Sequence, residues 1–393
     1  MWEKVVYAGA QSASFEQAAR DLSQLAELDI SDQRVRRGTI LIGNERVQQR
    51  DAQTAAYEEL SLPAQRASPV EQVPQVACVE MDGGRLQIRQ RGAKPEEPTS
   101  AGFWREMKVG CLTSLRSQVS IADPCPQLPA TFVDPAKMAE IVREIKGFSG
   151  AAPAAEEADE PAESSSDDRP GRPKPLARSV VATRRGVEEF GPLLAAAAWS
   201  RGFAAALRKA FVADGSEANW GVWRKHFSDY VPILDFIHAL CYVYAAALAG
   251  RAPEVGWALY RDWAQWVWSG QVQRVIAALE QRQQELGLPD AAEPESSPRS
   301  QVAKTLGYLQ NQAGRMRYDE YRRAGLPIVS SGVESTVKRI NRRVKGTEKF
   351  WSVGAEALLT LTADHLSDTP VLAHFWRDRH LRCTGMRCYH QAV

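Results

Sequence analysis

The chain of 393 residues is 44% hydrophobic and 25% charged, which is ordinary for globular proteins and excludes a chain that is disordered, collagenous or coiled-coil throughout. At roughly 150 residues per domain, its length predicts two or three domains. The net charge of +1 gives no general argument for a polyanionic partner. No run approaches the roughly 18 apolar residues of a membrane span, and the start lacks the basic-then-apolar order of a signal peptide. We therefore expect a cytoplasmic protein without a membrane partner.

The first 70 residues are expected to be helical. Ser14 and Gln17 have the spacing of a capping box, and a second helix start follows at Ser31,. Basic residues occupy the first turns of that second helix, namely Arg34, Arg36 and Arg37. This outline matches a helix-turn-helix, whose second helix can enter the major groove of DNA. A plain helical hairpin has the same outline and is the alternative.

A period of two begins at residue 75 and predicts strands. Strands over 76–81 and 86–89 would form a hairpin whose turn is Asp82-Gly83-Gly84-Arg85,. A third strand over 107–115 fits beside this hairpin. Later segments predict a strand over 180–183, a helix over 190–207 and two short strands over 210–213 and 231–234. This order indicates a mixed α/β sheet with polar residues at strand ends.

Low-complexity and aromatic segments divide the rest of the chain. Residues 151–174 and 288–299 are rich in Ala, Pro, Ser and acidic residues, and the first of them is expected to be a disordered acidic insert,. Large rings crowd the segment after His238 (Trp257, Tyr260, Trp263, Trp266 and Trp268). A helical core is the favoured interpretation of these rings, and base stacking is the alternative.

Six scattered cysteines in a chain without a signal peptide indicate reduced thiols rather than a disulfide framework,. Zinc-ligand residue types cluster near the end of the chain, at His380, Cys383, Cys388 and His390. Structural zinc sites usually have two short ligand pairs separated by a long loop. The compressed spacing here makes a zinc site the less favoured interpretation.

Three acidic residues stand out by their positions. Asp82 is at the predicted hairpin bend, Asp214 ends a short apolar strand, and Glu334 is in a helix predicted to open at Ser330 and Ser331. Each also has a structural explanation: a hairpin turn for Asp82, a strand-end turn for Asp214, and a capping box with an ion pair to Lys338 for Glu334. The sequence pattern leaves both interpretations open.

The surroundings of Glu334 favour chemistry on a phosphodiester. Residues 301–350 contain eleven basic and four acidic residues, a local charge of +7. Val333, Val337, Ile340 and Val344 would form the buried face of the helix, which leaves Lys338, Arg342 and Lys345 outward. A carboxylate on a basic helix suits a site that holds a DNA backbone and presents an acid to a metal. A solvated basic face is the alternative.

Four blocks in this order resemble the bacterial insertion-sequence transposases of the ISKra group. They are 81–87 (MDGGRLQ), 211–215 (FVADG) with Trp220, 234–238 (LDFIH), and 330–335 (SSGVES) running into 343–351 (RVKGTEKFW). The Asp235-x-x-His238 element also resembles one in the related Mutator-type transposases. The similarity extends from about Ser14 over nearly the whole chain.

The resemblance implies a ribonuclease-H-like mixed sheet and a DDE triad of Asp82, Asp214 and Glu334. Such carboxylates hold two divalent ions, Mg²⁺ or Mn²⁺, that activate the attacking oxygen and stabilise the leaving one. Asp235 and His238 would order the scissile strand or support the metal site. Basic residues near the last acid would bind DNA phosphates, namely Lys338, Arg342, Arg343, Lys345 and Lys349.

The same resemblance gives an expected organisation. A helix-turn-helix-like region (1–70) precedes the first part of the catalytic core (71–238). An all-helical insertion (239–325), the last part of the core with its basic helix (326–365) and a tail (366–393) follow. Members of the group usually carry a cysteine-rich, zinc-ribbon-like segment ahead of the helical region, and nothing before Ser14 could supply it, so a shortened copy is expected.

Three functions remain as hypotheses. The first is an active transposase that cleaves double-stranded DNA at transposon ends and joins it to a target, acting as a homo-oligomer on DNA in the bacterial nucleoid. The second is a truncated, non-catalytic DNA-binding remnant or repressor of the element. The third is a ribonuclease-H-type nuclease for host use.

Overall fold

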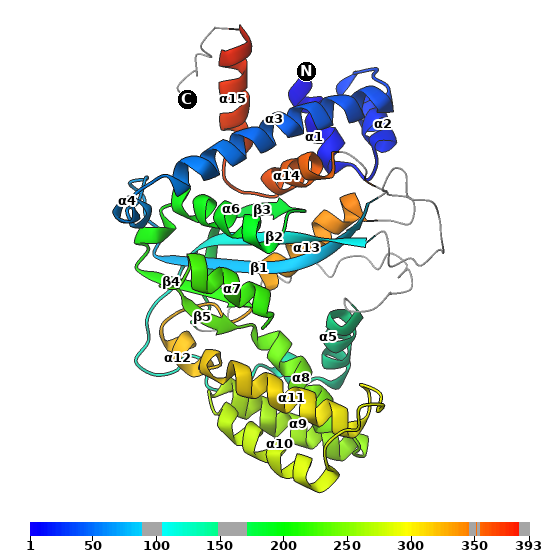
Figure 1. Ribbon diagram of the computed structural model, residues 1–393, viewed down its shortest axis with the longest axis vertical. Helices are drawn as coiled ribbons and strands as arrows, with labels where there is room; N and C mark the ends of the chain where they lie inside the picture. The colour runs from blue at the N-terminus through cyan, green and yellow to red at the C-terminus, as the bar shows by residue number, and fades with distance from the viewer. Residues whose placement is uncertain (89–103, 148–170, 346–350, 352–353, 385–393) are drawn as a thin grey trace.

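Apolar segments from several parts of the chain form a sheet at the centre of the molecule (Figure 1). The computed structural model describes residues 1–88, 104–147, 171–345, 351 and 354–384. Within these ranges the sheet has five strands in the order β3-β2-β1-β4-β5. Strands β1 (Val76–Gln87), β2 (Trp104–Arg116) and β3 (Lys174–Thr183) are antiparallel, whereas β4 (Arg208–Ala213) and β5 (Val231–Leu234) continue the sheet parallel to β1. The predicted α/β class with a mixed sheet is confirmed.

The predicted hairpin at Asp82 is wrong. Strand β1 runs without a break through Asp82, Gly83 and Gly84, which pair with Val109, Lys108 and Met107 of β2. A two-residue hairpin turn needs a positive φ, and neither glycine has one. A Cβ on Gly84 would lie 2.3 Å from the Met107 side chain, so this glycine permits the close approach of β2 instead of a turn.

Two pairs of helices cover the two faces of the sheet. On one face, α6 (Val187–Ser200) approaches Gly110 so closely that a Cβ there would lie 2.5 Å from Leu194. The adjacent α7 (Glu217–His226) packs its Trp220 near Phe211 of β4. The opposite face carries α13 (Ser331–Val344) and α14 (Ala355–His365). The four apolar residues predicted for the inner side of α13 are all buried, namely Val333, Val337, Ile340 and Val344.

Between β5 and α13 the chain is helical. It forms α8 (Phe236–Leu248), α9 (Pro253–Trp268), α10 (Val272–Leu286), α11 (Pro298–Gln312) and α12 (Tyr318–Arg323), and this group lies at one end of the long axis (Figure 1). Tyr260, Trp263 and Trp268 are buried, as the core-packing interpretation predicts. The connection between β2 and β3 contains α5 (Pro135–Gly147) and a 3₁₀ turn at Ala130–Val133.

The N-terminal helices lie at the opposite end, with the C-terminal α15 (Val371–Thr384) projecting beyond them (Figure 1). They are α1 (Trp2–Gln11), α2 (Phe15–Ala26) and α3 (Asp32–Glu58), and the short α4 (Leu62–Arg66) follows α3 at the level of the sheet. Ser14 caps α2 by accepting a hydrogen bond from the Gln17 backbone N–H at 3.0 Å, and α3 follows the predicted start at Ser31. Among the described helices, none combines the length and apolar character that crossing a membrane requires.

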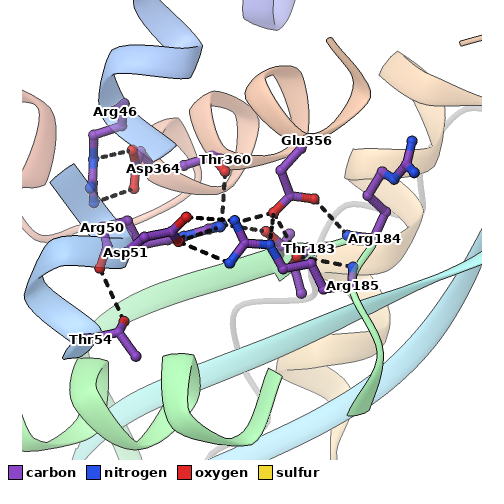
Figure 2. A network of polar contacts seen from close by, with 11 residues as sticks. Arg46, Arg50, Asp51, Thr54, Thr183, Arg184, Arg185, Glu356, Thr360 and Asp364 are labelled. Atoms are coloured by element: carbon purple, nitrogen blue, oxygen red, sulfur yellow. Dashed lines mark hydrogen bonds and ion pairs between the residues drawn. The ribbon is translucent and has the colours of Figure 1, made fainter. Parts of the chain in front are cut away.

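Buried arginines attach α3 to the rest of the fold (Figure 2). The Nε atom of Arg46 is 2.9 Å from Asp364 Oδ2, and Arg50 Nη2 is 2.9 Å from Glu356 Oε1. Glu356 also accepts a hydrogen bond from Thr183 of β3 at 2.6 Å. These contacts join α3 to α14 and to the edge strand β3. Removing one partner of such a buried pair would leave an uncompensated charge.

Candidate active site

Strand register places three acidic residues at one edge of the sheet. Glu80 of β1 pairs with Val212 of β4, so Asp82 and Asp214 are level two residues further along their strands. Ala213 in turn pairs with Leu234 of β5, so Asp214 is level with Asp235. Strands β4 and β5 end at this level, whereas β1 continues past Asp82 to Gln87. The order of strands thus brings together acids that are far apart in the sequence.

Asp82 is on the face of β1 that α13 covers, and its side chain is half-buried. Its Oδ1 accepts a hydrogen bond from the Gly83 backbone N–H at 2.6 Å. Burial and the negative charge of Asp214 raise the pKa of Asp82 to about 6, because both disfavour the carboxylate form.

Asp214 follows the last residue of β4, as predicted. Its Oδ1 accepts two hydrogen bonds, from the Ser216 backbone N–H at 2.9 Å and from Asn219 Nδ2 at 2.8 Å. Both donors belong to the start of α7. This oxygen is therefore fixed in place, and the other carboxylate oxygen can face a ligand.

Asp235 is fully buried at the N-terminus of α8 and accepts four hydrogen bonds. Oδ1 accepts from the backbone N–H of His238 at 2.8 Å and lies 3.0 Å from His238 Nδ1. Oδ2 accepts from the Ser330 backbone N–H and from its hydroxyl at 2.8 Å. A carboxylate has about four acceptor positions, so Asp235 is saturated by protein donors.

The Asp235 carboxylate also controls the charge of His238. Burial alone would lower the pKa of His238, but the hydrogen bond and negative charge of Asp235 outweigh it and raise this pKa to about 9,. The same contact lowers the pKa of Asp235 despite its burial. At neutral pH the pair is therefore a carboxylate and an imidazolium, with Nδ1–H donating to Asp235.

Glu334 approaches from the first turn of α13. Its Oε1 is 3.8 Å from His238 Nδ1 and is buried with no hydrogen-bond partner among the residues that the structure describes. Burial and the charge of Asp235 raise the pKa of Glu334 to about 7. A buried polar atom without a partner is costly. The predicted side-chain capping bond at the start of α13 is absent from this part of the chain.

Glu80 belongs to the site, although sequence reasoning did not select it. It is buried beneath the start of α13, where Oε2 accepts a hydrogen bond from the Val333 backbone N–H at 3.0 Å. A Cβ on Gly332 would lie 2.6 Å from that oxygen. Burial raises the pKa of Glu80 to about 8. The available signal was its spacing, because residues two apart in a strand share a face with each other, here Glu80 and Asp82.

Side-chain distances select a different metal-ligand group from the expected triad. Within the described ranges, Asp235, His238 and Glu334 offer ligand atoms that all lie within 4.8 Å of one another. Asp82 and Asp214 are not in that group, although the charge of Asp214 acts on Asp82 and that of Asp82 on Glu334. Because Asp235 is saturated by protein donors, its oxygens are the least available of these for a cation.

The basic residues expected to bind DNA fall into two groups. Lys338 and Arg342 are exposed on the outer side of α13, and Lys345 is exposed directly after its end. The arginines at 34, 36 and 37 are exposed at the start of α3. Lys338 also forms an ion pair with Glu144 of α5 at 2.9 Å. Lys349 is outside the described residues.

The role expected for Arg343 is corrected. Its side chain is buried, and both Nε and Nη2 donate to the Gly9 carbonyl of α1, at 3.1 and 2.8 Å. The guanidinium also lies over the Phe15 ring, 4.5 Å from its centroid. Arg343 thus joins α13 to the N-terminal helices and does not face a DNA phosphate in this structure.

Of the four residues with zinc-ligand character near the end of the chain, His380 and Cys383 are exposed on α15, and Cys388 and His390 lie outside the described residues.

In comparisons with known proteins, no family model matches the chain and no curated protein matches it.

Proposed function

We propose that the protein is a DNA transposase of the DDE type, similar to the ISKra group, that cleaves transposon ends and joins them to target DNA. The observation that carries this proposal is the strand register: Glu80 pairs with Val212, which brings Asp82 level with Asp214. Glu334 is contributed by α13, whose start packs on Glu80 of β1. The three acidic residues are far apart in the sequence, and β1, β4 and α13 each supply one of them.

The donor set fits divalent cations. Asp82 and Glu334 both have raised pKa values, of about 6 and about 7, because of burial and neighbouring carboxylates. Glu334 Oε1 has no hydrogen-bond partner in the described structure, and one oxygen of Asp214 remains for a ligand. A cation would satisfy these oxygens and relieve their repulsion. Oxygen ligands of this kind suit Mg²⁺ or Mn²⁺.

In this proposal Asp82, Asp214 and Glu334 would hold two such ions. When bound, the ions supply activation of the attacking oxygen and stabilisation of the leaving oxygen. The order of three antiparallel strands, a helix and two parallel strands supports the ribonuclease-H-like core that the resemblance implies.

Asp235 and His238 have a separate role in the proposal. Asp235 joins the start of α8 to the start of α13 through His238 and Ser330, so it sets the position of the helix that carries Glu334. His238 is cationic at neutral pH because its pKa is about 9. With Nδ1–H donating to Asp235, the proton on Nε2 is left to donate to a DNA phosphate oxygen.

The DNA backbone would be bound by the exposed basic side chains of α13. Lys338 and Arg342 follow Glu334 on the same helix, and Lys345 comes directly after its end. Cationic side chains supply the sequence-independent part of DNA affinity. The exposed arginines at the start of α3 would add a second contact with the duplex. The protein would act as a homo-oligomer on paired DNA ends.

The test is cleavage and strand transfer on supercoiled DNA that carries the element's flanking ends, with Mg²⁺ or Mn²⁺. Asp214→Ala should abolish both reactions, whereas Asp262→Ala, which removes an exposed acid of α9, should leave them unchanged. Cleavage without joining would instead indicate a nuclease. DNA binding without cleavage by the wild type would indicate a repressor or remnant and would refute the catalytic proposal.

A further inference from the structure

The turn that carries Asp214 is in contact with the helical segment between β5 and α13. Tyr308 of α11 donates a hydrogen bond from its hydroxyl to the Asp214 carbonyl at 2.8 Å. One helical turn further along, Gln312 Nε2 donates to the Gly215 carbonyl at 3.2 Å. Residues four apart lie on the same face of a helix. One face of α11 therefore holds two consecutive carbonyls of the turn.

The fit between α11 and this turn is close. Gly215 has a φ of +94°, which favours glycine, and a Cβ at this position would lie 2.9 Å from the Tyr308 ring and hydroxyl. The Tyr308 ring also stacks on Tyr242 of α8, with centroids 3.8 Å apart and planes 11° apart. Tyr308 is thus fixed in position between α8 and the turn.

A second chain of contacts supports Gln312. Arg315 Nη1 donates to Gln312 Oε1 at 2.8 Å, which leaves the Gln312 amide nitrogen to face Gly215. The Arg315 guanidinium lies 4.4 Å from the centroid of the Trp220 ring in α7. The helix α7 also supplies the Asn219 amide that donates to the Asp214 carboxylate. Arg315 therefore joins α11, which binds the backbone of the turn, to α7, which binds the Asp214 side chain.

We propose that Tyr308 and Gln312 are positioning residues for Asp214, so that the helical segment holds this carboxylate in the geometry that a divalent cation requires. This inference rests on the proposed function, because it names what orients one proposed ligand. Neither residue touches the Asp214 carboxylate; each acts through the backbone of the turn. Partners that orient a metal ligand affect affinity strongly, typically about 10-fold or more.

The experiment compares Tyr308→Phe with Tyr260→Phe in the full-length protein. Tyr260 is the matched control because its buried hydroxyl also donates to a backbone carbonyl, that of Phe132 at 2.9 Å, but away from the acidic residues. Each variant loses one hydrogen bond from a tyrosine hydroxyl to a backbone carbonyl, so both should lower the melting temperature, Tyr260→Phe at least as much as Tyr308→Phe because its bond is the more buried. Mn²⁺ affinity by calorimetry, and the Mn²⁺ dependence of cleavage, are then measured.

We expect Tyr308→Phe to weaken Mn²⁺ binding about 10-fold, with cleavage recovering at saturating Mn²⁺, while Tyr260→Phe binds as the wild type does. Equal Mn²⁺ affinities in the two variants would overturn the positioning role and leave the proposed function intact, provided that Asp214→Ala abolishes metal-dependent cleavage.

A measurement without metal separates this inference from the proposed function. Hydrogen exchange of residues 213–217 in metal-free protein should be faster in Tyr308→Phe than in Tyr260→Phe, because the turn has lost a fixed carbonyl. If the wild type neither binds Mn²⁺ nor cleaves DNA, the proposed function fails, and this exchange measurement alone decides the positioning role. Unchanged exchange would overturn it.

Discussion

Replacing Asp235 with Asn tests how much the structure depends on one buried carboxylate. The side chain is fully buried, and its two oxygens accept four hydrogen bonds from His238 and Ser330. Asparagine has nearly the same shape but only one acceptor oxygen, so two of the four bonds are lost and its amide N–H₂ faces other donors. A hydrogen bond to a charged group contributes about 1.5 to 3 kcal/mol. After the reduced cost of burying a neutral group, we expect a loss of about 3 kcal/mol in the free energy of unfolding.

The substitution also changes the titration of His238. In the wild type the pKa of His238 is raised to about 9. The contribution of protonated His238 to the free energy of unfolding is therefore fully present below the ordinary pKa of 6.5 and is lost as pH rises through 9. In Asp235→Asn the burial of His238 remains while the carboxylate is gone, so its pKa falls. Urea unfolding between pH 6 and 9 with a chelator present measures the stability, and NMR of the His238 ring protons measures the pKa. An unchanged unfolding midpoint together with an unchanged His238 titration would refute the reasoning.

Three further predictions concern other residues. In metal-free protein, the pKa of Glu334 is raised from 4.5 to about 7, so the free energy of unfolding of the wild type should fall by at most about 3 kcal/mol as pH rises from 4.5 to 7. Urea unfolding of Glu334→Gln should lack the part of this fall that Glu334 causes. An identical pH profile in the two proteins would contradict the raised pKa of Glu334. Arg343→Ala should lower the free energy of unfolding by about 3 kcal/mol because it removes a buried side chain and its two hydrogen bonds to Gly9,. Arg342→Ala, at an exposed position, should lower it less and should weaken DNA binding in a filter assay. Glu356→Gln should lower the free energy of unfolding by about 3 kcal/mol because it weakens the ion pair with the buried Arg50,. Thermal unfolding compares it with Glu16→Gln, whose exposed ion pair contributes little,. Equal melting temperatures would count against the network in Figure 2.

Local patterns were sufficient to predict several parts of the fold and site. The short apolar runs that end at Asp214 and Asp235 are strands β4 and β5, because a run of buried residues followed by a polar residue and a helix start is visible in the sequence. The apolar residues at helical spacing in α13 are buried as predicted. The large rings of α9 pack in the core for the same reason, since apolar surface leaves water wherever the chain allows it.

Features that depend on a distant partner could not be predicted in this way. The Asp82-Gly83-Gly84 sequence fits a hairpin turn as well as a strand interior, and only the continuous pairing with β2 decides for the strand. The adjacent Arg342 and Arg343 are alike in sequence, yet the second is buried because α1 presents the Gly9 carbonyl to it. Side-chain environment depends on tertiary neighbours, which a single sequence does not name.

The amino-acid sequence by itself determined that β4 and β5 are strands, that Asp214 and Asp235 follow them, and that α13 buries one apolar face. The tertiary structure decided which of these acids meet, that Asp235 is saturated by protein donors, and that Glu80 lies beneath α13. Glu80 and the Val333 N–H that it accepts from are 253 residues apart. Periodicity encodes the burial of one face of an element, but the contact between two faces forms only when the whole sheet and its covering helices pack together.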